Sequence, residues 1–506
     1  MIQFMDNRLN AITMYRLVLY ILIVLLGIAE VLSAAGLLPF SPLNLLVSTL
    51  FLIVVCWIAN DIFAAIFEVP ANAESIYISA LILALIIAPA QSTSDLWFLF
   101  WAGVWAMACK YILAINRKHV FNPVGFAVAL TALTINQTAD WWVGNIRMLP
   151  FVVLAGILIV RKTRRSTMVL TFLAVSLLTT VVLTLLGRSS VPATLEQTLF
   201  SSPLVFFAAV ILTEPLTTPP TRSLQIIYGA LVGFLISPQF HVGSFYTTPE
   251  LSILVGNVFS YIVSPKAKLL LRLKDKVQIA PDIYDFVFTP SPRLAFAPGQ
   301  YMEWTLGHDH ADSRGNRRYF TLASSPTERD LVLGVRFYPN SSSYKQAMLA
   351  MDQDTEIVAA QLAGDFVLPR SPRIRLVFIA GGIGITPFRS MIQYLLDTRQ
   401  KRPITLFYAN RTVSEIVYKD VFDRAQRELG IKTIYTLTDA SKVPLAWKGR
   451  VGYITPQIIK AEVPHFADCF YYLSGPNAMV TSFEQALRRL RVSKSHIKTD
   501  FFPGFA

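Results

Sequence analysis

The chain has few cysteines for its length, and this shortage excludes two kinds of structure. Its 506 residues include three cysteines, Cys56, Cys109 and Cys469, which lie far apart in the sequence. Three thiolates cannot supply the four ligands of a plant-type iron–sulfur cluster. Their scattered spacing also implies no disulfide framework. Two of them lie in apolar runs, and we expect these two to be buried as small apolar side chains.

Charge is scarce as well, but only in the first half of the chain. Charged residues make up 15% of the sequence and hydrophobic residues 54%, whereas a soluble protein has about 25% charged residues. Residues 1–265 form a series of apolar runs, and an ordinary charged sequence begins at Lys266. We therefore predict a polytopic membrane domain followed by a soluble part. The net charge of +13 does not indicate nucleic-acid binding, because the basic residues fall mainly at membrane-loop positions and in the soluble half.

The apolar runs predict ten membrane-spanning helices, some shorter than the roughly 20 residues of a full span. The N-terminal run is predicted to be the first span and not a cleaved signal. Basic residues gather in the loops on the side of the N-terminus, which places both termini and the soluble part in the cytoplasm, at a cell (inner) membrane. The predicted spans are 14–37, 43–67, 75–91, 95–115, 121–136, 147–160, 167–187, 198–213, 223–237 and 250–264.

Two segments have the composition of interrupted helices. Residues 119–130 begin an apolar run with Asn-Pro, and residues 212–225 contain three prolines and four threonines. Backbone groups freed by proline at membrane depth are satisfied by protein or line a cavity. Interrupted segments in both halves favour an inverted repeat around a central site, with ordinary loops as the alternative. Glu30, Asp61 and Lys110 lie in predicted spans and are candidate functional residues, with a proton or sodium pathway through Glu30 or Asp61 as one interpretation. The alternative is that each lies near a span end and snorkels or pairs.

A family resemblance enters through motifs spread over residues 60–265. In order, they are EVPANAESIYISALILALIIAP, LWFLFWAGVWAMACKYILA, FNPVGFAVAL, FFAAVILTEPLTTPPT, IIYGALVGFLIS and ELSILVGN. They resemble a membrane component of the sodium-translocating NADH:quinone reductase and its counterpart in the Rnf complex, which implies a ten-helix, flavin-carrying membrane domain. The Ser-Gly-Ala-Thr-like segment that carries covalent FMN in that family is missing from residues 135–148, and Thr194 lies too late in the order and lacks the glycine. The membrane domain is therefore expected to hold a non-covalent flavin (FMN or riboflavin) or none.

The second half changes to β-rich and then alternating patterns. Short β-rich runs separated by Pro, Gly and Asn predict an antiparallel β-barrel over residues 266–371. Alternating strand and helix patterns predict an open, mainly parallel α/β domain over residues 372–506. Its first strand runs into a turn with Gly381, Gly382 and Gly384, followed by a helix. Such glycines let the backbone approach a diphosphate, and the helix N-terminus supplies N–H groups and partial positive charge.

The barrel followed by the α/β sheet resembles the ferredoxin–NADP reductase superfamily, with APGQYMEW, RYFTLASSP and NSSSYKQAM as its barrel motifs. By this resemblance Arg318 would pair with the FAD diphosphate, for which a guanidinium fork is suited. Phe320 would stack on the isoalloxazine, and Thr321 would hydrogen-bond near flavin N5. Ser342 or Ser343 would make the second diphosphate contact.

The same resemblance assigns the coenzyme site. GGIGITP matches the pyridine-nucleotide loop, with Thr386 near the nicotinamide, and Ser474 stands where the family usually has a cysteine beside that ring. With Thr321, these two residues are the predicted catalytic set. Arg411 would bind a 2′-phosphate, but Asn-Arg-Thr also occurs in NADH-using relatives, so NADH, which we favour, and NADPH both stay open. The remaining predicted contacts are Asn410 on the adenosine side, Gly475 and Pro476 after Ser474, and Phe505 as the aromatic that shields the flavin.

One further loop has potential metal ligands. His308 and His310 lie with Asp309 and Asp312 in the polar segment HDHADSRGNR. A solvated loop is the favoured interpretation, so no metal site is predicted.

Together these features predict a single-chain membrane oxidoreductase that passes electrons from cytoplasmic NAD(P)H through FAD to a membrane flavin or a quinone. The resemblance leaves open coupling to Na⁺ or H⁺ and delivery of electrons to the outer face. A transporter or flavin carrier with a redox-sensing reductase domain is one alternative. A transmembrane b-haem reductase is another, but it needs stacked histidine pairs, and the membrane half has only His119 and His241. The fusion is predicted to act alone or as a homo-oligomer.

Overall fold

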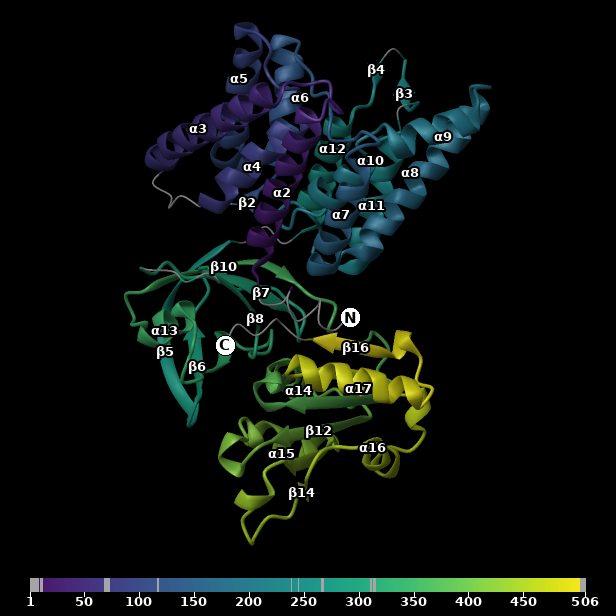
Figure 1. Cartoon of the computed structure of the whole chain (residues 1–506). Helices are drawn as coiled ribbons and strands as arrows, with labels where there is room; N and C mark the ends of the chain where they lie inside the picture. The colour runs from purple at the N-terminus through teal and green to yellow at the C-terminus, as the bar shows by residue number, and fades with distance from the viewer. Residues whose placement is uncertain are drawn as a thin grey trace. The chain divides into compact units, whose positions relative to one another are not determined.

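The computed structural model describes residues 9, 12–67, 73–115, 118–237, 239–243, 245–264, 268–309, 312 and 315–500. The chain divides into two compact units, Met1–Lys266 and Ala267–Ala506 (Figure 1). The domain boundaries predicted from the sequence, including the one at residue 371 inside the second unit, stay predictions.

The first unit is helical, as its long apolar runs require, because a helix satisfies its own backbone groups without water. Every predicted span overlaps a helix. The helices are α2 (Met14–Ala34), α3 (Pro42–Phe67), α4 (Ala73–Ile86), α5 (Thr93–Ile112), α6 (Pro123–Ile135), α7 (Leu149–Thr163), α8 (Ser166–Leu186), α9 (Val191–Phe200), α10 (Leu204–Phe206), the π-helix η1 (Phe207–Ile211), α11 (Arg222–Leu235) and α12 (Pro249–Val263). Two short hairpins, β1 (Ala114–Ile115) with β2 (Lys118–His119) and β3 (His241–Val242) with β4 (Phe245–Tyr246), complete it.

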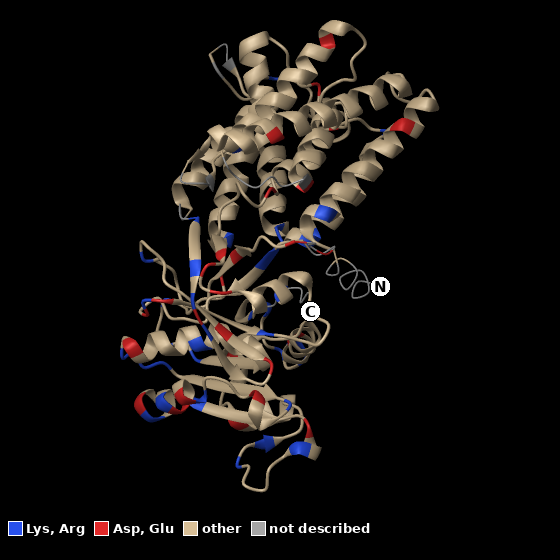
Figure 2. Cartoon of the chain, turned by 90° about the vertical axis from the view of Figure 1, so that its left-hand side faces the viewer, with Lys and Arg blue, Asp and Glu red and all other residues tan. Residues whose placement is uncertain are grey.

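Fewer of the described helices are long and apolar enough to cross a membrane than the ten spans that the sequence predicts. Among the described residues, α2, α3 and α8 are long and apolar enough to cross a membrane, and α9 with the segment Leu204–Ile211, bent by 55°, would make a fourth crossing. Helices such as α4 end early because proline follows; Pro89 lies three residues after Ile86. Ten spans therefore stay a prediction. Figure 2 shows how few charged residues the helical unit carries compared with the second unit.

The second unit begins with an antiparallel sheet of six strands in the order β8-β7-β10-β5-β6-β9. The long strand β5 pairs with β10 through its first residues and with β6 through its last. The order ends at β8 and β9, and closure of this sheet into the predicted barrel stays a prediction. The strands are β5 (Leu269–Ala280), β6 (Ile283–Phe288), β7 (Tyr301–Thr305), β8 (Arg317–Thr321), β9 (Leu331–Arg336) and β10 (Glu356–Ala363), with helix α13 (Ser343–Ala350) between β9 and β10.

The second sheet is parallel throughout, in the order β14-β13-β12-β11-β15-β16, which confirms the predicted parallel α/β arrangement. Its central strand β11 is buried on both faces, as its unbroken apolar sequence requires. Alternate residues of β11 pack with α14 and α15 on one face and with α16 and α17 on the other. The elements are β11 (Leu376–Gly381), η2 (Gly382–Ile385), α14 (Thr386–Asp397), β12 (Ile404–Asn410), η3 (Val413–Glu415), α15 (Lys419–Leu429), β13 (Lys432–Leu437), η4 (Ala440–Lys442), β14 (Arg450–Val451), α16 (Pro456–Glu462), η5 (Phe466–Asp468), β15 (Phe470–Ser474), α17 (Asn477–Arg489), η6 (Lys494–His496) and β16 (Ile497–Asp500).

Candidate active site

The glycine loop lies at the carboxyl end of the central strand of the parallel sheet. Strand β11 ends at Gly381, and Gly382 has φ +53°, a conformation that favours glycine. A Cβ added to Gly384 would lie 2.6 Å from the Cα of Gly475, so the predicted nucleotide loop touches the loop that follows β15. This edge of an open α/β sheet, where a helix starts directly after the turn, is the usual place for a nucleotide.

Two polar residues complete this edge. Ser474 is in register with Ala380 on one side and with Asp500, the last residue of β16, on the other. Both Ser474 and Asp500 are buried. Thr386 begins α14 and is buried as well, with its hydroxyl donating to the Ile383 carbonyl at 3.3 Å. The structure thus brings together two of the three predicted catalytic residues and adds a carboxylate.

Thr321 reaches this edge from the antiparallel sheet. It ends β8, and its hydroxyl donates to the Asp500 carboxylate, with 3.2 Å between Oγ1 and Oδ2. This bond joins the strand predicted to hold the flavin to the sheet predicted to hold the coenzyme. Sequence analysis did not select Asp500. The last strand predicted from the sequence was residues 469–475, so β16 and the carboxylate at its end were both missed.

Arg318 and Phe320 lie on the same strand, on one side of helix α13. The Arg318 guanidinium carbon lies 4.9 Å from the centroid of the Tyr344 ring, and Phe320 lies 6.2 Å from that ring, tilted by 38°. Arg318 is 6% exposed and donates to the carbonyls of Gly315 and Arg317. A buried guanidinium is favoured beside an anion, so this position fits a diphosphate.

The start of α13 fits the predicted second diphosphate contact in part. Ser342 is its buried N-cap and accepts a hydrogen bond from the Lys345 N–H at 3.3 Å. The N–H of Ser343 donates to the Asp312 carboxylate at 2.9 Å, and its hydroxyl contacts His308 Nε2 at 3.0 Å. His308 is therefore part of an ordered contact with this helix, whereas a solvated loop was expected. The described residues contain no group of three metal-ligating side chains, and His310 lies outside the described residues.

The loop after β12 carries the predicted adenosine-side residues. Asn410 ends the strand and is buried, and Arg411 follows it at the surface. The carboxylate of Glu415 lies 2.9 Å from the Arg336 guanidinium on β9. This ion pair ties the loop to the antiparallel sheet, so the loop is held from both sheets.

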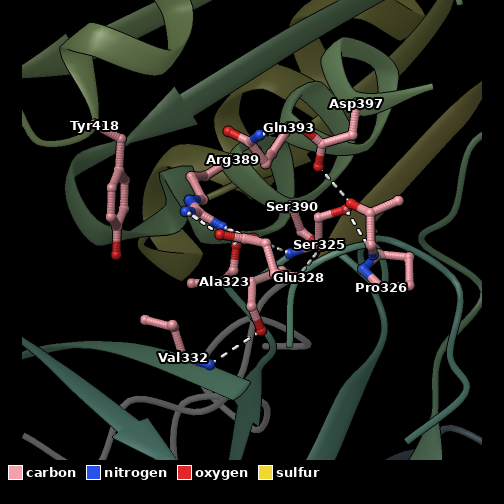
Figure 3. Close-up of polar contacts among 12 residues, drawn as sticks. Ala323, Ser325, Pro326, Glu328, Val332, Arg389, Ser390, Gln393, Asp397 and Tyr418 are labelled. Carbon is pink, nitrogen blue, oxygen red and sulfur yellow. Dashed lines mark hydrogen bonds and ion pairs between the residues drawn. The ribbon is translucent and has the colours of Figure 1, made fainter. Parts of the chain in front are cut away.

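A second group of contacts crosses between the sheets beside this loop (Figure 3). Arg389 of α14 donates from Nη2 to Oε1 of Glu328 at 2.8 Å, and its Nη1 contacts Oε2 of Glu328 and the Ala323 carbonyl. Ser390, the next residue, donates to the Ser324 carbonyl at 2.7 Å. The segment after β8 is therefore fixed against α14, the helix that follows the central strand of the parallel sheet.

In the helical unit, the two predicted interruptions meet at a carboxylate. Asn122 caps α6, and its side-chain amide donates to Glu214 at 2.8 Å. Thr217 donates to the same carboxylate at 2.9 Å, and the backbone N–H of Asn122 donates to Asn257 of α12 at 2.7 Å. Glu214 follows the π-helix η1 and precedes a proline. Sequence analysis selected its segment but not the residue.

Of the ionisable residues that sequence analysis did select, Lys110 lies close enough to Glu214 for the two charges to interact. Lys110 donates to the carbonyl and the hydroxyl of Ser75 at 2.9 and 3.0 Å, so it links α5 to α4. Glu30 is half-buried and Asp61 is exposed. A role for any of them in ion movement stays a prediction.

Phe505, the aromatic residue predicted to shield the flavin, lies outside the described residues.

Each half of the chain matches the model of a known protein family. Residues 114–266 match the model of the NQR2, RnfD, RnfE family, and residues 378–485 match the model of the oxidoreductase NAD-binding domain. Both predicted resemblances are thereby confirmed.

Individual relatives match the second half. NADH-cytochrome b5 reductase 1 of Ajellomyces capsulatus is 26% identical over 256 residues, which cover 47% of this chain and 81% of that protein. The flavohemoprotein of Pseudomonas putida is 27% identical over 46% of this chain and 58% of its own length. Among solved structures, the Amycolatopsis cytochrome P450 reductase GcoB is 25% identical, with 47% of this chain and 70% of that chain covered and a TM-score of 0.42.

Proposed function

Since this chain joins a region of the NQR2, RnfD, RnfE family to an NAD(P)H-dependent FAD oxidoreductase, we propose that it passes electrons from cytoplasmic NAD(P)H through FAD into its membrane domain. The acceptor there is a bound non-covalent flavin or a quinone. The protein acts in the cell (inner) membrane, alone or as a homo-oligomer. Movement of electrons toward the outer face, coupled to Na⁺ or H⁺, is the extended form of this proposal.

The observation that carries the proposal is the bond between Thr321 and Asp500. It brings the flavin-side strand to the edge where Ser474 and the glycine loop lie, so one site serves both nucleotides. FAD, when bound, accepts two electrons as a hydride and releases them singly, which no side chain here can do.

The chain's own residues hold the reactants. Arg318 holds the FAD diphosphate, and Thr386 and Ser474 orient the nicotinamide ring. The Thr321 hydroxyl donates its proton to Asp500 Oδ2, which fixes the orientation of Oγ1 on the strand that would hold the flavin. These roles require a site from which water is largely excluded, as the burial of Thr321, Ser474 and Asp500 supports.

The membrane side of the proposal is supported by the contact between Asn122 and Glu214. A carboxylate among apolar helices is costly unless it is hydrogen-bonded, and such residues usually mark functional positions. Glu214 receives hydrogen bonds from both interrupted segments, so the interruptions form one polar centre. This centre is our candidate for the region that receives the electrons or the coupled ion.

The proposal is tested first by the visible spectrum of the detergent-purified chain before and after NADH or NADPH, with flavin counted per chain. Flavin that bleaches with either coenzyme is expected. Two bleachable flavins per chain support a membrane flavin, whereas one supports direct quinone reduction. A spectrum that neither coenzyme changes, or a haem Soret band, would overturn the proposal.

Reconstituted vesicles test the membrane step. Addition of NADH outside inverted vesicles should reduce a quinone in the bilayer, and a Na⁺ or pH dye inside then reports coupling. A transporter with a redox-sensing domain, the rival function, predicts uptake of labelled riboflavin or Na⁺ without net quinone reduction.

A further inference from the structure

Tyr418 makes a hydrogen bond that crosses between the two sheets of the second unit. It directly precedes α15, and its hydroxyl donates to Oδ1 of Asp285 on β6 at 2.6 Å. Its backbone has φ +57°, a left-handed conformation that a bulky residue rarely adopts. Such a conformation persists where the surrounding contacts fix it, so the position of this side chain is strongly determined.

The acceptor, Asp285, lies near Thr386 at the start of α14. Asp285 is paired in register with Gly334 of β9. A Cβ added to Gly334 would lie 2.5 Å from the Tyr418 hydroxyl and 2.9 Å from Cγ2 of Thr386. Only a residue without a side chain lets both groups approach the strand. Tyr418 and the nicotinamide-side residue Thr386 therefore meet the antiparallel sheet at the same point.

The next residue on this face of β9 contacts the segment that leads to Tyr418. Arg336 lies two positions after Gly334, so both face the same side of the strand. Arg336 pairs with Glu415 at 2.9 Å, and a Cβ added to Gly382 would lie 3.6 Å from its Nη1. The segment from Glu415 to Tyr418 is thus attached to the antiparallel sheet at two points.

We propose that Tyr418 is a positioning residue for hydride transfer. Its bond to Asp285, made beside Thr386, fixes the segment Glu415–Tyr418 relative to the flavin-side sheet. The inference rests on the proposed function, since it concerns the same transfer. Figure 3 shows the Tyr418 ring beside the Arg389 guanidinium, with 5.7 Å between the ring centroid and Cζ. Tyr418 itself touches neither reactant in this proposal and acts through the distance between the two sheets.

The chain offers a matched control for the test. Tyr435 of β13 donates its hydroxyl to Asp423 of α15 at 3.2 Å, a bond that stays within the nucleotide-binding sheet and its helices. Tyr435→Phe and Tyr418→Phe each remove one Tyr–Asp bond and keep the ring. On the acceptor side, Asp285→Asn keeps an oxygen that can accept the Tyr418 proton, whereas Asp285→Ala does not.

The measurement is stopped-flow reduction of the flavin in the full-length protein by NADH, with the limiting rate and the half-saturating NADH concentration fitted separately. Tyr418→Phe and Asp285→Ala should lower the limiting rate about tenfold, since small displacements of reactants cost large factors in rate. The half-saturating concentration should stay within about twofold, because no coenzyme contact is removed. Tyr435→Phe and Asp285→Asn should keep the wild-type rate.

Two results would overturn the inference. One is an unchanged limiting rate in Tyr418→Phe. The other is a loss that follows flavin content and melting temperature equally in Tyr418→Phe and Tyr435→Phe, which would assign the bond to stability alone. Failure of the proposed function looks different: wild-type flavin would then be reduced by neither NADH nor NADPH.

Discussion

Replacing Arg389 by leucine should destabilise the second unit by about 2–3 kcal/mol. A charged pair that is broken by removing one partner costs about 3–5 kcal/mol when it is fully buried. The Arg389 side chain is 14% exposed and that of Glu328 is 30% exposed, so water partly screens the carboxylate that remains. The leucine also removes a donor from the Ala323 carbonyl, which the guanidinium reaches at 3.1 Å.

The assay is thermal unfolding of the full-length protein followed by flavin fluorescence, which reports the second unit. For a unit of this size, about 2–3 kcal/mol corresponds to a decrease of about 5–10 °C in melting temperature. Arg424→Leu is the control, because Arg424 pairs with Glu428 at 3.4 Å while both side chains are more than two-fifths exposed. It should change the melting temperature by no more than about 1 °C.

The double variant Arg389→Leu with Glu328→Leu separates a charge effect from simple loss of packing. Replacing both partners of a buried pair by apolar residues is often nearly neutral, so the double variant should be more stable than Arg389→Leu alone. If its destabilisation instead equals the sum of the two single effects, the reasoning about the pair is wrong.

Four further outcomes follow from the site. Arg318→Leu should purify with less than about half the wild-type flavin, since a guanidinium–diphosphate contact is lost; absorbance per chain checks this. Asp500→Asn should keep its flavin but be reduced about tenfold more slowly in stopped flow, because the acceptor for the Thr321 proton is weakened. Arg411→Ala should raise the half-saturating NADPH concentration more than that of NADH, which steady-state kinetics would test. Burial raises the pKa of Asp285 to about 6, although the Tyr418 hydroxyl lowers it. The protonated form is therefore favoured in the folded state, and its stabilisation is lost as pH rises from about 4 through 6. The melting temperature of Asp285→Asn should accordingly gain on wild type over that range.

The local parts of the site could be predicted from the sequence because they depend on short patterns. An apolar run followed by closely spaced glycines specifies a buried strand and a tight turn, and Gly381, Gly382 and Gly384 lie where that pattern places them. Thr386 likewise begins the helix that follows the turn. The order of β and α patterns was enough to predict a parallel sheet.

The contacts that join the two sheets could not be predicted in this way. Thr321 and Asp500 are 179 positions apart, and Tyr418 and Asp285 are 133 apart. Nothing in either local sequence specifies which residue lies opposite, because that depends on strand order and register.

The number of membrane spans is hard to predict from the sequence for a different reason. Apolar composition marks a helix that is buried in protein as well as one that crosses lipid, so α4 and α6 match the pattern and still fall short of a full span.

Glu214 shows how far the reasoning from sequence can reach inside the membrane unit. The prolines of its segment predicted freed backbone groups, and the same was predicted for the Asn122–Pro123 start of α6. Neither prediction named a partner, yet the two segments meet through the bond between Asn122 and Glu214, 92 positions apart. Since Asn122 also donates its backbone N–H to the amide oxygen of Asn257, this one residue joins the carboxylate to α12. A polar centre held by three separate segments is more than the repair of one broken helix would need, because freed backbone groups require local partners and not a carboxylate. Carboxylates among membrane helices are typical of ion and proton pathways, which is why we propose Glu214 as the centre of the membrane site.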